Sequence, residues 1–181
     1  TKLTIYDADD PDMPMWIVFD CNTRDMLGGV HESGGSWLGA AEMLNGGLHI
    51  ASYSGYSPYY FGVNFISDKG VMISHTNSYN MIGDISQRND GLNGYVVSGG
   101  VLCHLYCRDV AVTVLPNAPI DPSTGLPVST VAVATGNGVS VIKDNGLIVD
   151  IGYANYDEVH NIYFNSKNHL IFSQYNGATQ S

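Results

Sequence analysis

The sequence predicts an all-β protein built from short antiparallel strands that recur along the chain. The main observation is that the segment 62–74 has a counterpart at 138–150. In both segments a glycine begins an alternating apolar run, an aspartate lies two residues before a second glycine, and another apolar run follows. This pattern predicts a strand, a turn and a strand. Val63 and Val139 lie 76 residues apart with Val101 midway between them, and a period in this range indicates a repeat architecture.

The composition favours the same fold class. Hydrophobic residues make up 44% of the 181 residues, which is enough for a buried core, whereas charged residues make up only 13%. Gly, Ser, Asn, Thr and Tyr account for much of the rest, a mixture typical of strands joined by tight turns. Helix formers are scarce, since Glu occurs only at positions 32, 42 and 158.

The charge excludes several partners. A formal net charge of −10 argues against nucleic acid, whose binding depends on a basic surface, and against an anionic membrane. No apolar run reaches about 18 residues, so no membrane insertion is expected. A signal peptide is not expected either, because no charged segment followed by an apolar stretch opens the sequence.

Strands and turns can be assigned in order. Strands are expected at 15–19 and 26–30, and a hairpin is expected at 37–52 around the turn Asn45-Gly46-Gly47. The segment 165–177 echoes this hairpin. Further strands are expected at 95–97 and 110–115, while 116–127 is a Pro-rich loop, which cannot lie in the centre of a sheet.

These strands group into repeated units of four, which is the content of a propeller blade. The sequence therefore predicts a single segment, 1–181, of antiparallel four-stranded blades that forms a partial β-propeller. It would hold about three blades' worth of strands and would start and end inside a blade. The approximate blades are 15–33 (half), 37–76, 95–152 and 157–177 (half). A solenoid-like or sandwich arrangement is the alternative, since three blades alone do not close a ring.

The segment 129–146 resembles blades of the YVTN, NHL and WD40-like β-propellers. It carries an apolar strand, a small polar turn, the run Gly-Val-Ser-Val-Ile and then Asp-Asn-Gly, and the segment 159–173 resembles the first two strands of a next blade. The chain lacks the Trp-Asp dipeptide of the WD40 pattern. The Pro-rich loop is also similar to segments of bacteriophage tail and fibre proteins. This resemblance implies a virion or extracellular location and a role in host attachment.

No cofactor, metal or catalytic residue is predicted. Asp7, Asp9, Asp10 and Asp12 invite a calcium site but lack the Gly and the distal Glu of an EF-hand loop, so a solvated turn is favoured. The pair His31-Glu32 has no second His at helical spacing. Cys103, His104 and Cys107 lack the remaining ligands of a structural zinc site, so buried thiols are expected. A metal-binding cluster formed by His49, His75, His160 and His169 is a further hypothesis, although their spacing does not show that they converge.

The aromatic residues are the candidate binding site. Five of them fall within nine residues, in a segment rich in Ser, Gly and Pro: Tyr53, Tyr56, Tyr59, Tyr60 and Phe61. Rings on a loop stack on sugars or anchor a protein partner, although the same residues also pack between sheets.

The functional expectation is therefore a non-enzymatic structural and binding module. Its partners would be other proteins, further copies that complete the propeller, or a host-surface glycan. The alternative is a secreted propeller enzyme, a polysaccharide lyase or hydrolase, with its site in the central channel. The scarcity of Glu and the lack of a recognisable pair of acid and base residues weaken that alternative.

Overall fold

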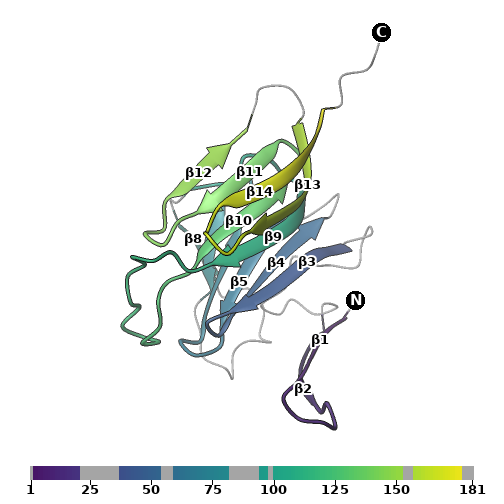
Figure 1. The fold of residues 1–181 in the computed structure, drawn as a ribbon, viewed down its shortest axis with the longest axis vertical. Coiled ribbons are helices and arrows are strands. Elements are labelled where there is room, and N and C mark those ends of the chain that lie inside the picture. Colours follow the sequence, from purple (N-terminus) through teal and green to yellow (C-terminus); the bar gives the residue numbers. More distant parts are fainter. Residues whose placement is uncertain are drawn as a thin grey trace.

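The computed structural model describes residues 2–20, 37–53, 59–81, 94–97, 100–152 and 157–176. Within these residues the chain forms strands and no helix, which confirms the all-β fold class (Figure 1). The strands are β1 (Lys2–Tyr6), β2 (Met15–Asp20), β3 (Trp37–Leu44), β4 (Gly47–Tyr53), β5 (Tyr60–Asn64), β6 (Lys69–Ile73), β7 (Ser78–Met81), β8 (Gly94–Val97), β9 (Cys107–Thr113), β10 (Thr130–Thr135), β11 (Gly138–Ile142), β12 (Ile148–Ile151), β13 (Asp157–Phe164) and β14 (Leu170–Asn176).

The strands form four antiparallel sheets in which neighbours in space are also neighbours in sequence. Strands β1 and β2 form a hairpin, β3 to β8 form a six-stranded sheet, β9 to β12 a four-stranded sheet, and β13 and β14 a second hairpin. Each sheet is therefore a simple meander. Short turns join several of these neighbours, such as the two-residue turn Asn45-Gly46 between β3 and β4, where both residues have positive φ.

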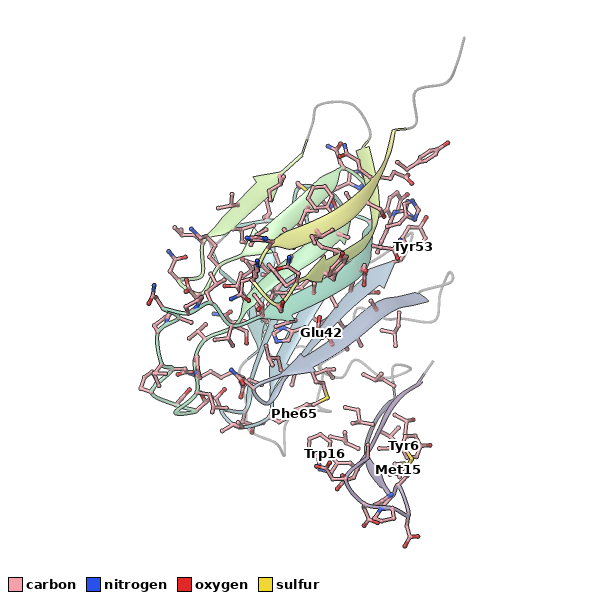
Figure 2. The ribbon with its side chains drawn as sticks, in the orientation of Figure 1. Tyr6, Met15, Trp16, Glu42, Tyr53 and Phe65 are labelled. Atoms are coloured by element: carbon pink, nitrogen blue, oxygen red, sulfur yellow. The ribbon has the colours of Figure 1, made fainter. Side chains whose placement is uncertain are left out.

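The sheets are stacked face to face, with an apolar core between each pair of layers. The first core lies between the β1–β2 hairpin and the six-stranded sheet and includes Ile50 and Phe61. The second lies between the six-stranded and the four-stranded sheet, and the third between the four-stranded sheet and the β13–β14 hairpin. Figure 2 shows Trp16 of β2 beside Phe65 of the β5–β6 turn, and their ring centroids are 5.2 Å apart.

Strand β10 lies at the centre of the stack, and all six of its residues are buried. Its side chains alternate between the two flanking cores. Val131 and Val133 face the six-stranded sheet, whereas Ala132 and Ala134 face the β13–β14 hairpin. Because both faces are covered, the strand reads as a continuous apolar run rather than as an alternation of polar and apolar residues.

Carboxylates join the first strands of successive sheets. Glu42 of β3 accepts a hydrogen bond from the Val112 amide of β9 (2.8 Å), and Figure 2 shows it at the boundary between the two sheets. Asp109 of β9 accepts one from the Ile162 amide of β13 (2.9 Å). The strands β3, β9 and β13 thus lie side by side, and side chains rather than sheet ladders satisfy these outward-facing amides.

The sheet boundaries differ from the predicted repeat boundaries. The four strands expected in 37–76 are present as β3 to β6, but the same sheet continues through β7 and β8. The strand at 95–97, which was expected to begin the next unit, pairs with β7 instead. Strand β2 pairs with β1, while the partner expected at 26–30 lies outside the described residues. Four-stranded units therefore do not divide the described chain evenly.

The segments 62–74 and 138–150 both form hairpins, but their turns are not equivalent. In the first, Asn64 pairs with Lys69, so the turn is 65–68 and Gly70 lies in β6. In the second, Ile142 pairs with Ile148, and Gly146 lies in the turn with a φ of 79°. The predicted order of strand, turn and strand is therefore confirmed in both segments. Their turns differ in register, because the glycine of the shared Asp-x-Gly spacing lies in a strand in one copy and in the turn in the other.

Candidate functional site

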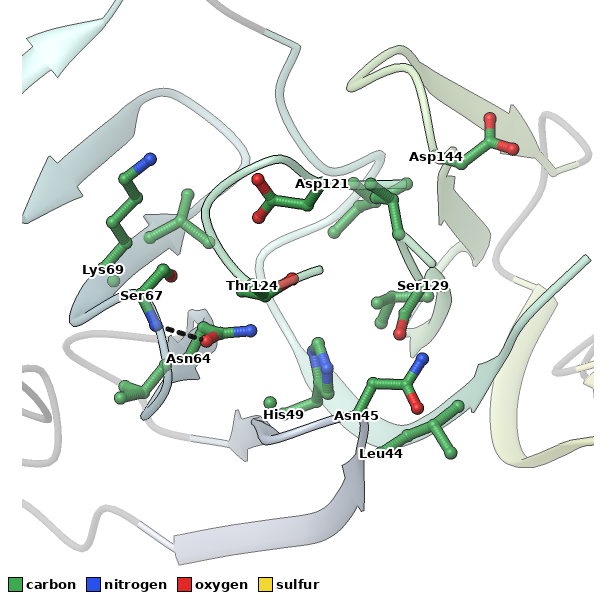
Figure 3. Close-up of a pocket in the computed structure, with 18 of the residues that line it drawn as sticks. Leu44, Asn45, His49, Asn64, Ser67, Lys69, Asp121, Thr124, Ser129 and Asp144 are labelled. Carbon is green, nitrogen blue, oxygen red and sulfur yellow. Dashed lines mark hydrogen bonds between the residues drawn. The ribbon is translucent and has the colours of Figure 1, made fainter. Parts of the chain in front are cut away.

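A pocket of about 990 Å³ opens between the six-stranded and the four-stranded sheets (Figure 3). One wall consists of strands β4, β5 and β6. The Pro-rich loop between β9 and β10 and the turn between β11 and β12 form the other walls. This volume lies at the upper end of the range typical of small-molecule sites.

Hydrogen bonds hold the Pro-rich loop in place as a wall. Asn45 Nδ2, in the β3–β4 turn, donates to the Pro127 carbonyl (3.1 Å), and Ile120 forms an isolated bridge with Pro127. Asp121 Oδ1 accepts from both the amide and the hydroxyl of Ser123. These two bonds, with a smaller contribution from Lys69, lower the pKa of the Asp121 carboxyl. The loop is therefore tied both to itself and to the opposite sheet.

The floor of the pocket carries a pair of polar side chains, of which Tyr60 is buried and His49 half-buried. His49 Nδ1 and Tyr60 Oη are 2.7 Å apart, and the two rings are stacked with an interplanar angle of 16°. Burial lowers the pKa of His49 to about 4 and raises the pKa of the Tyr60 hydroxyl. Both side chains are consequently uncharged at neutral pH.

Two glycines make room for this pair. His49 and Gly62 are cross-strand partners, and Tyr60 lies two residues before Gly62 on the same face of β5. A Cβ added at Gly62 would come within 2.7 Å of Tyr60 Oη, and one added at Gly47 would come within 2.8 Å of His49 Nε2. The absence of side chains at these two positions thus allows the His49–Tyr60 pair to lie flat against the sheet.

The rest of the lining is aliphatic inside and polar at the rim. Aliphatic side chains from both sheets and from the loop line the interior, and they include Leu44, Val71, Val131, Leu126 and Ile142. The rim carries both charge signs, with Lys69 and Lys143 near Asp68, Asp121 and Asp144. Figure 3 shows His49 between Asn45 and Asn64, below Thr124 of the loop. The pocket therefore offers an apolar interior with few polar groups and no dominant charge at its rim.

The aromatic residues predicted to form a binding site do not lie together in the structure. Tyr60 lines the pocket but is only 3% exposed, while Phe61 points to the opposite face and lies in the first core. Tyr59 packs edge-on against Phe61, with ring centroids 5.8 Å apart. Tyr56 lies outside the described residues. Since Tyr60 and Phe61 are buried, replacing them with alanine would lower stability as well as any binding.

Tyr53 belongs to a separate cluster, at the end of β4. Its ring centroid lies 5.0 Å from that of Tyr106, and the Arg108 guanidinium lies 5.1 Å above the Tyr53 ring. Arg108 also forms an ion pair with Glu158 of β13 at 2.9 Å. These contacts join three sheets. Tyr106 and Arg108 pack against the Tyr53 ring, so they occupy ring surface on which a sugar or a partner would have to stack.

The structure does not assemble the metal sites weighed from the sequence. Among the described residues, no group of three or more His, Cys, Asp or Glu side chains is arranged to hold a metal ion. In the acidic segment, Asp7 and Asp10 each accept an amide hydrogen bond from the residue two positions later. Cys103 lies in a bend, and Cys107 is buried in the second core, where burial raises the pKa of its thiol to about 12. His31 and Glu32 lie outside the described residues.

The sequence identified His49 and Tyr60 separately, but not as a pair. Their contact depends on the register of β4 against β5, which pairs His49 with Gly62. A glycine opposite a histidine was the available signal, because it leaves space for a large neighbour. The Pro-rich loop was correctly placed outside the sheets, but its role as a pocket wall depends on contacts distant in sequence.

The described residues include no helix that could cross a membrane. No protein-family model matches the chain, and the searches of curated proteins and of solved structures found no match either.

Proposed function

We propose that this chain is a non-enzymatic binding module and that the pocket between its two larger sheets is the ligand site. The observation that carries the proposal is the combination of an aliphatic interior with an uncharged polar pair on the floor. Ligand sites typically have this composition, since apolar contacts supply affinity and a few polar groups fix the orientation.

The ligand that fits best is a segment of a protein partner that inserts an aliphatic side chain. Sugar-binding sites usually present an open aromatic face, whereas Tyr60, the tyrosine among the described residues that line this pocket, is almost completely buried. The rim instead carries amide and hydroxyl side chains such as Asn45, Asn64 and Ser129, which suit the donors and acceptors of a peptide backbone. These features favour a protein partner over a glycan.

The titratable groups support binding rather than catalysis. A general acid or base works best with a pKa near the working pH. His49 titrates near pH 4, the pKa of Tyr60 is raised, and the pKa of Asp121 is lowered. All three therefore keep one protonation state at neutral pH. An enzyme in this pocket would need another acid or base.

The stacked sheets are consistent with a partial β-propeller, which we include in the proposal. Three observations support it: the sheets are meanders in chain order, they pack face to face, and their first strands β3, β9 and β13 lie together, as inner strands do around a propeller axis. The six-stranded sheet departs from the four strands of a typical blade. A place in a virion tail or fibre is proposed from the sequence resemblance alone.

A peptide selection with a blocked pocket tests the binding proposal. Random heptapeptides displayed on phage would be selected on the immobilised chain and then measured individually against three proteins. These are the wild type, Ser129→Trp, which fills the pocket, and Ser166→Trp, a matched change in the exposed β13–β14 turn. We expect selected peptides rich in Leu, Ile or Val that bind Ser129→Trp at least tenfold more weakly and Ser166→Trp unchanged.

The proposal is wrong if no peptide is enriched, or if the enriched peptides bind Ser129→Trp as tightly as the wild type. Both variants must first show cooperative unfolding like that of the wild type. Turnover of a peptide or polysaccharide by the wild type, abolished by changing a single Asp or His, would instead establish the enzyme alternative.

A further inference from the structure

The geometry points to a specific anchor in this pocket. We propose that it takes an uncharged peptide unit whose aliphatic side chain enters the interior and whose carbonyl oxygen accepts a hydrogen bond from His49 Nε2–H. This inference rests on the proposed function, because it names the chemistry that the binding site recognises.

The first step is the position of the ring proton on His49. The hydroxyl of Tyr60 lies 2.7 Å from His49 Nδ1, and Nδ1 is the hydrogen-bond partner of that hydroxyl among the described residues. If Nδ1 carried the proton, it would donate to Tyr60, and the buried tyrosine proton would have no acceptor. An unpaired buried donor costs about 1–3 kcal/mol. The tyrosine therefore donates to Nδ1, and the proton of the neutral imidazole resides on Nε2.

The second step concerns the surroundings of Nε2–H and its lack of a hydrogen-bond partner among the described residues. Nε2 lies beside Gly47 on the pocket floor, where the glycine provides no side chain to cover it. Within the part of the chain that the structure describes, Nε2 has no hydrogen-bond partner. Figure 3 shows the ring directed into the space below Thr124. The pocket floor thus presents a hydrogen-bond donor, held in place by Tyr60, to an interior lined mainly by aliphatic side chains.

The third step is the charge of the group that this donor receives. Burying a carboxylate costs several kcal/mol unless a cation pairs with it, and both floor side chains are neutral. The nearest lysines in the lining, Lys69 and Lys143, are exposed at the rim, where aspartates accompany them. An ammonium group would meet a donor rather than an acceptor. An uncharged carbonyl oxygen is therefore the complementary group.

The fourth step connects this acceptor with the apolar interior. Leu44, Val71 and Val131 lie around the same space, so a ligand that satisfies Nε2–H also brings an apolar group into contact with them. A peptide unit with a leucine-sized side chain carries both features within a few bonds. Burying such a side chain contributes about 1.5–3 kcal/mol, so a single unit would bind weakly and a longer segment more tightly.

The test uses N-acetyl-L-leucine-N-methylamide as the probe, with the full chain labelled with ¹⁵N-histidine. N-acetylglycine-N-methylamide, which lacks the side chain, and N-acetyl-L-leucine, which carries a carboxylate, serve as comparators. Nitrogen shifts of the imidazole report the tautomer directly. We expect the Nε2-protonated form in the free protein, a saturable shift of His49 Nε2 with the leucine amide, and clearly weaker binding of both comparators.

Two substitutions at one position provide the matched control. The amide of His49→Asn retains an acceptor near Nδ1 for Tyr60 but has no donor near Nε2, whereas His49→Gln places its amide near Nε2. We expect His49→Asn to bind the leucine amide roughly three- to tenfold more weakly, the value of one neutral hydrogen bond, and His49→Gln to bind closer to the wild type.

An Nδ1-protonated His49, or equal binding of the leucine amide and the carboxylate comparator, would overturn the anchor. Both measurements use the wild type, so the anchor stays testable even if a variant does not fold. Either result leaves the proposed function standing as long as the selected peptides still bind Ser129→Trp at least tenfold more weakly than the wild type. Failure of the peptide selection would instead remove the binding site itself.

Discussion

His49 is a single side chain that makes the stability of the fold depend on pH. It lies on the pocket floor with Tyr60, and burial lowers its pKa to about 4, below the usual value of about 6.5. The fold therefore favours the neutral ring. This contribution to stability is complete above about pH 6.5 and is lost as the pH falls from there towards 4.

We expect acid to destabilise the wild type more than His49→Gln. Between pH 7 and pH 4.5, protonation of His49 should lower the unfolding free energy of the wild type by about 2–3 kcal/mol. Glutamine does not titrate, so His49→Gln should not show this part of the loss. Urea unfolding of both proteins at a series of pH values measures the difference. Parallel pH profiles for the two proteins would show that His49 is not buried as a neutral group.

At this scale the sequence predicted residue types better than their environments. It identified Tyr60 as a binding residue and His49 as one of several strand histidines, while their contact required the β4–β5 register. Alternation along β5 does place Tyr60 and Phe61 on opposite faces, but the sequence does not reveal that both faces are covered. Burial on two sides is a property of the stack, and a local pattern of residues does not encode it.

At the scale of the elements, the sheets are held to one another by carboxylates as well as by apolar contacts. Glu42 accepts from the Val112 amide of β9, and burial raises the pKa of its carboxyl. The charged form is thus partly disfavoured in the fold, so this carboxyl reduces stability as the pH rises through its titration range. The same side chain satisfies an amide that would otherwise lie buried without a partner.

We expect Glu42→Ala to destabilise the protein by about 1–2 kcal/mol, because Val112 N–H loses its acceptor. Glu42→Gln retains an acceptor oxygen and no longer titrates, so it should match or exceed the wild-type stability at pH 7. Denaturant unfolding of the three proteins provides the measurement. Equal stability of the alanine and glutamine variants would contradict a linking role for this hydrogen bond.

Hairpins are the elements that the sequence predicted most reliably. The dipeptide Asn45-Gly46 specifies a tight turn because both residues adopt positive φ at low cost, and the β3–β4 hairpin forms there. The Asp-x-Gly spacing was less informative. In the first copy Asp68 itself has a φ of 57° and closes the turn, so Gly70 is free to enter the strand. Turn type depends on which residue adopts positive φ, and more than one residue in each copy is able to do so.

At the scale of the molecule, the four-stranded sheet is covered unevenly on its outer side. Strand β13 lies against β9 and β10, whereas the outer face of β12 carries Val149 and Ile151, which are 47% and 40% exposed. Within the described residues, β11 is the only strand that pairs with β12. An apolar strand with one free edge promotes association between chains.

We expect the chain to associate reversibly as its concentration rises, and Val149→Lys to shift it towards the monomer, because edge lysines oppose strand pairing. Light scattering coupled to size-exclusion chromatography, over a range of protein concentrations, measures this. Ile66→Lys, which adds the same charge in the exposed β5–β6 turn, is the control and should associate like the wild type. A wild type that stays monomeric at every concentration would contradict the prediction.

Strand β10 has a consequence for how the molecule opens. Its six residues are covered by a sheet on one face and by a hairpin on the other, and it pairs with β9 and β11 along both edges. No partial fluctuation of the outer hairpins exposes its amides to solvent, so their deuterium exchange should require global unfolding. These amides would therefore report the free energy of the whole stack, and the slowest-exchanging segment of the protein would be the one that is richest in valine and alanine.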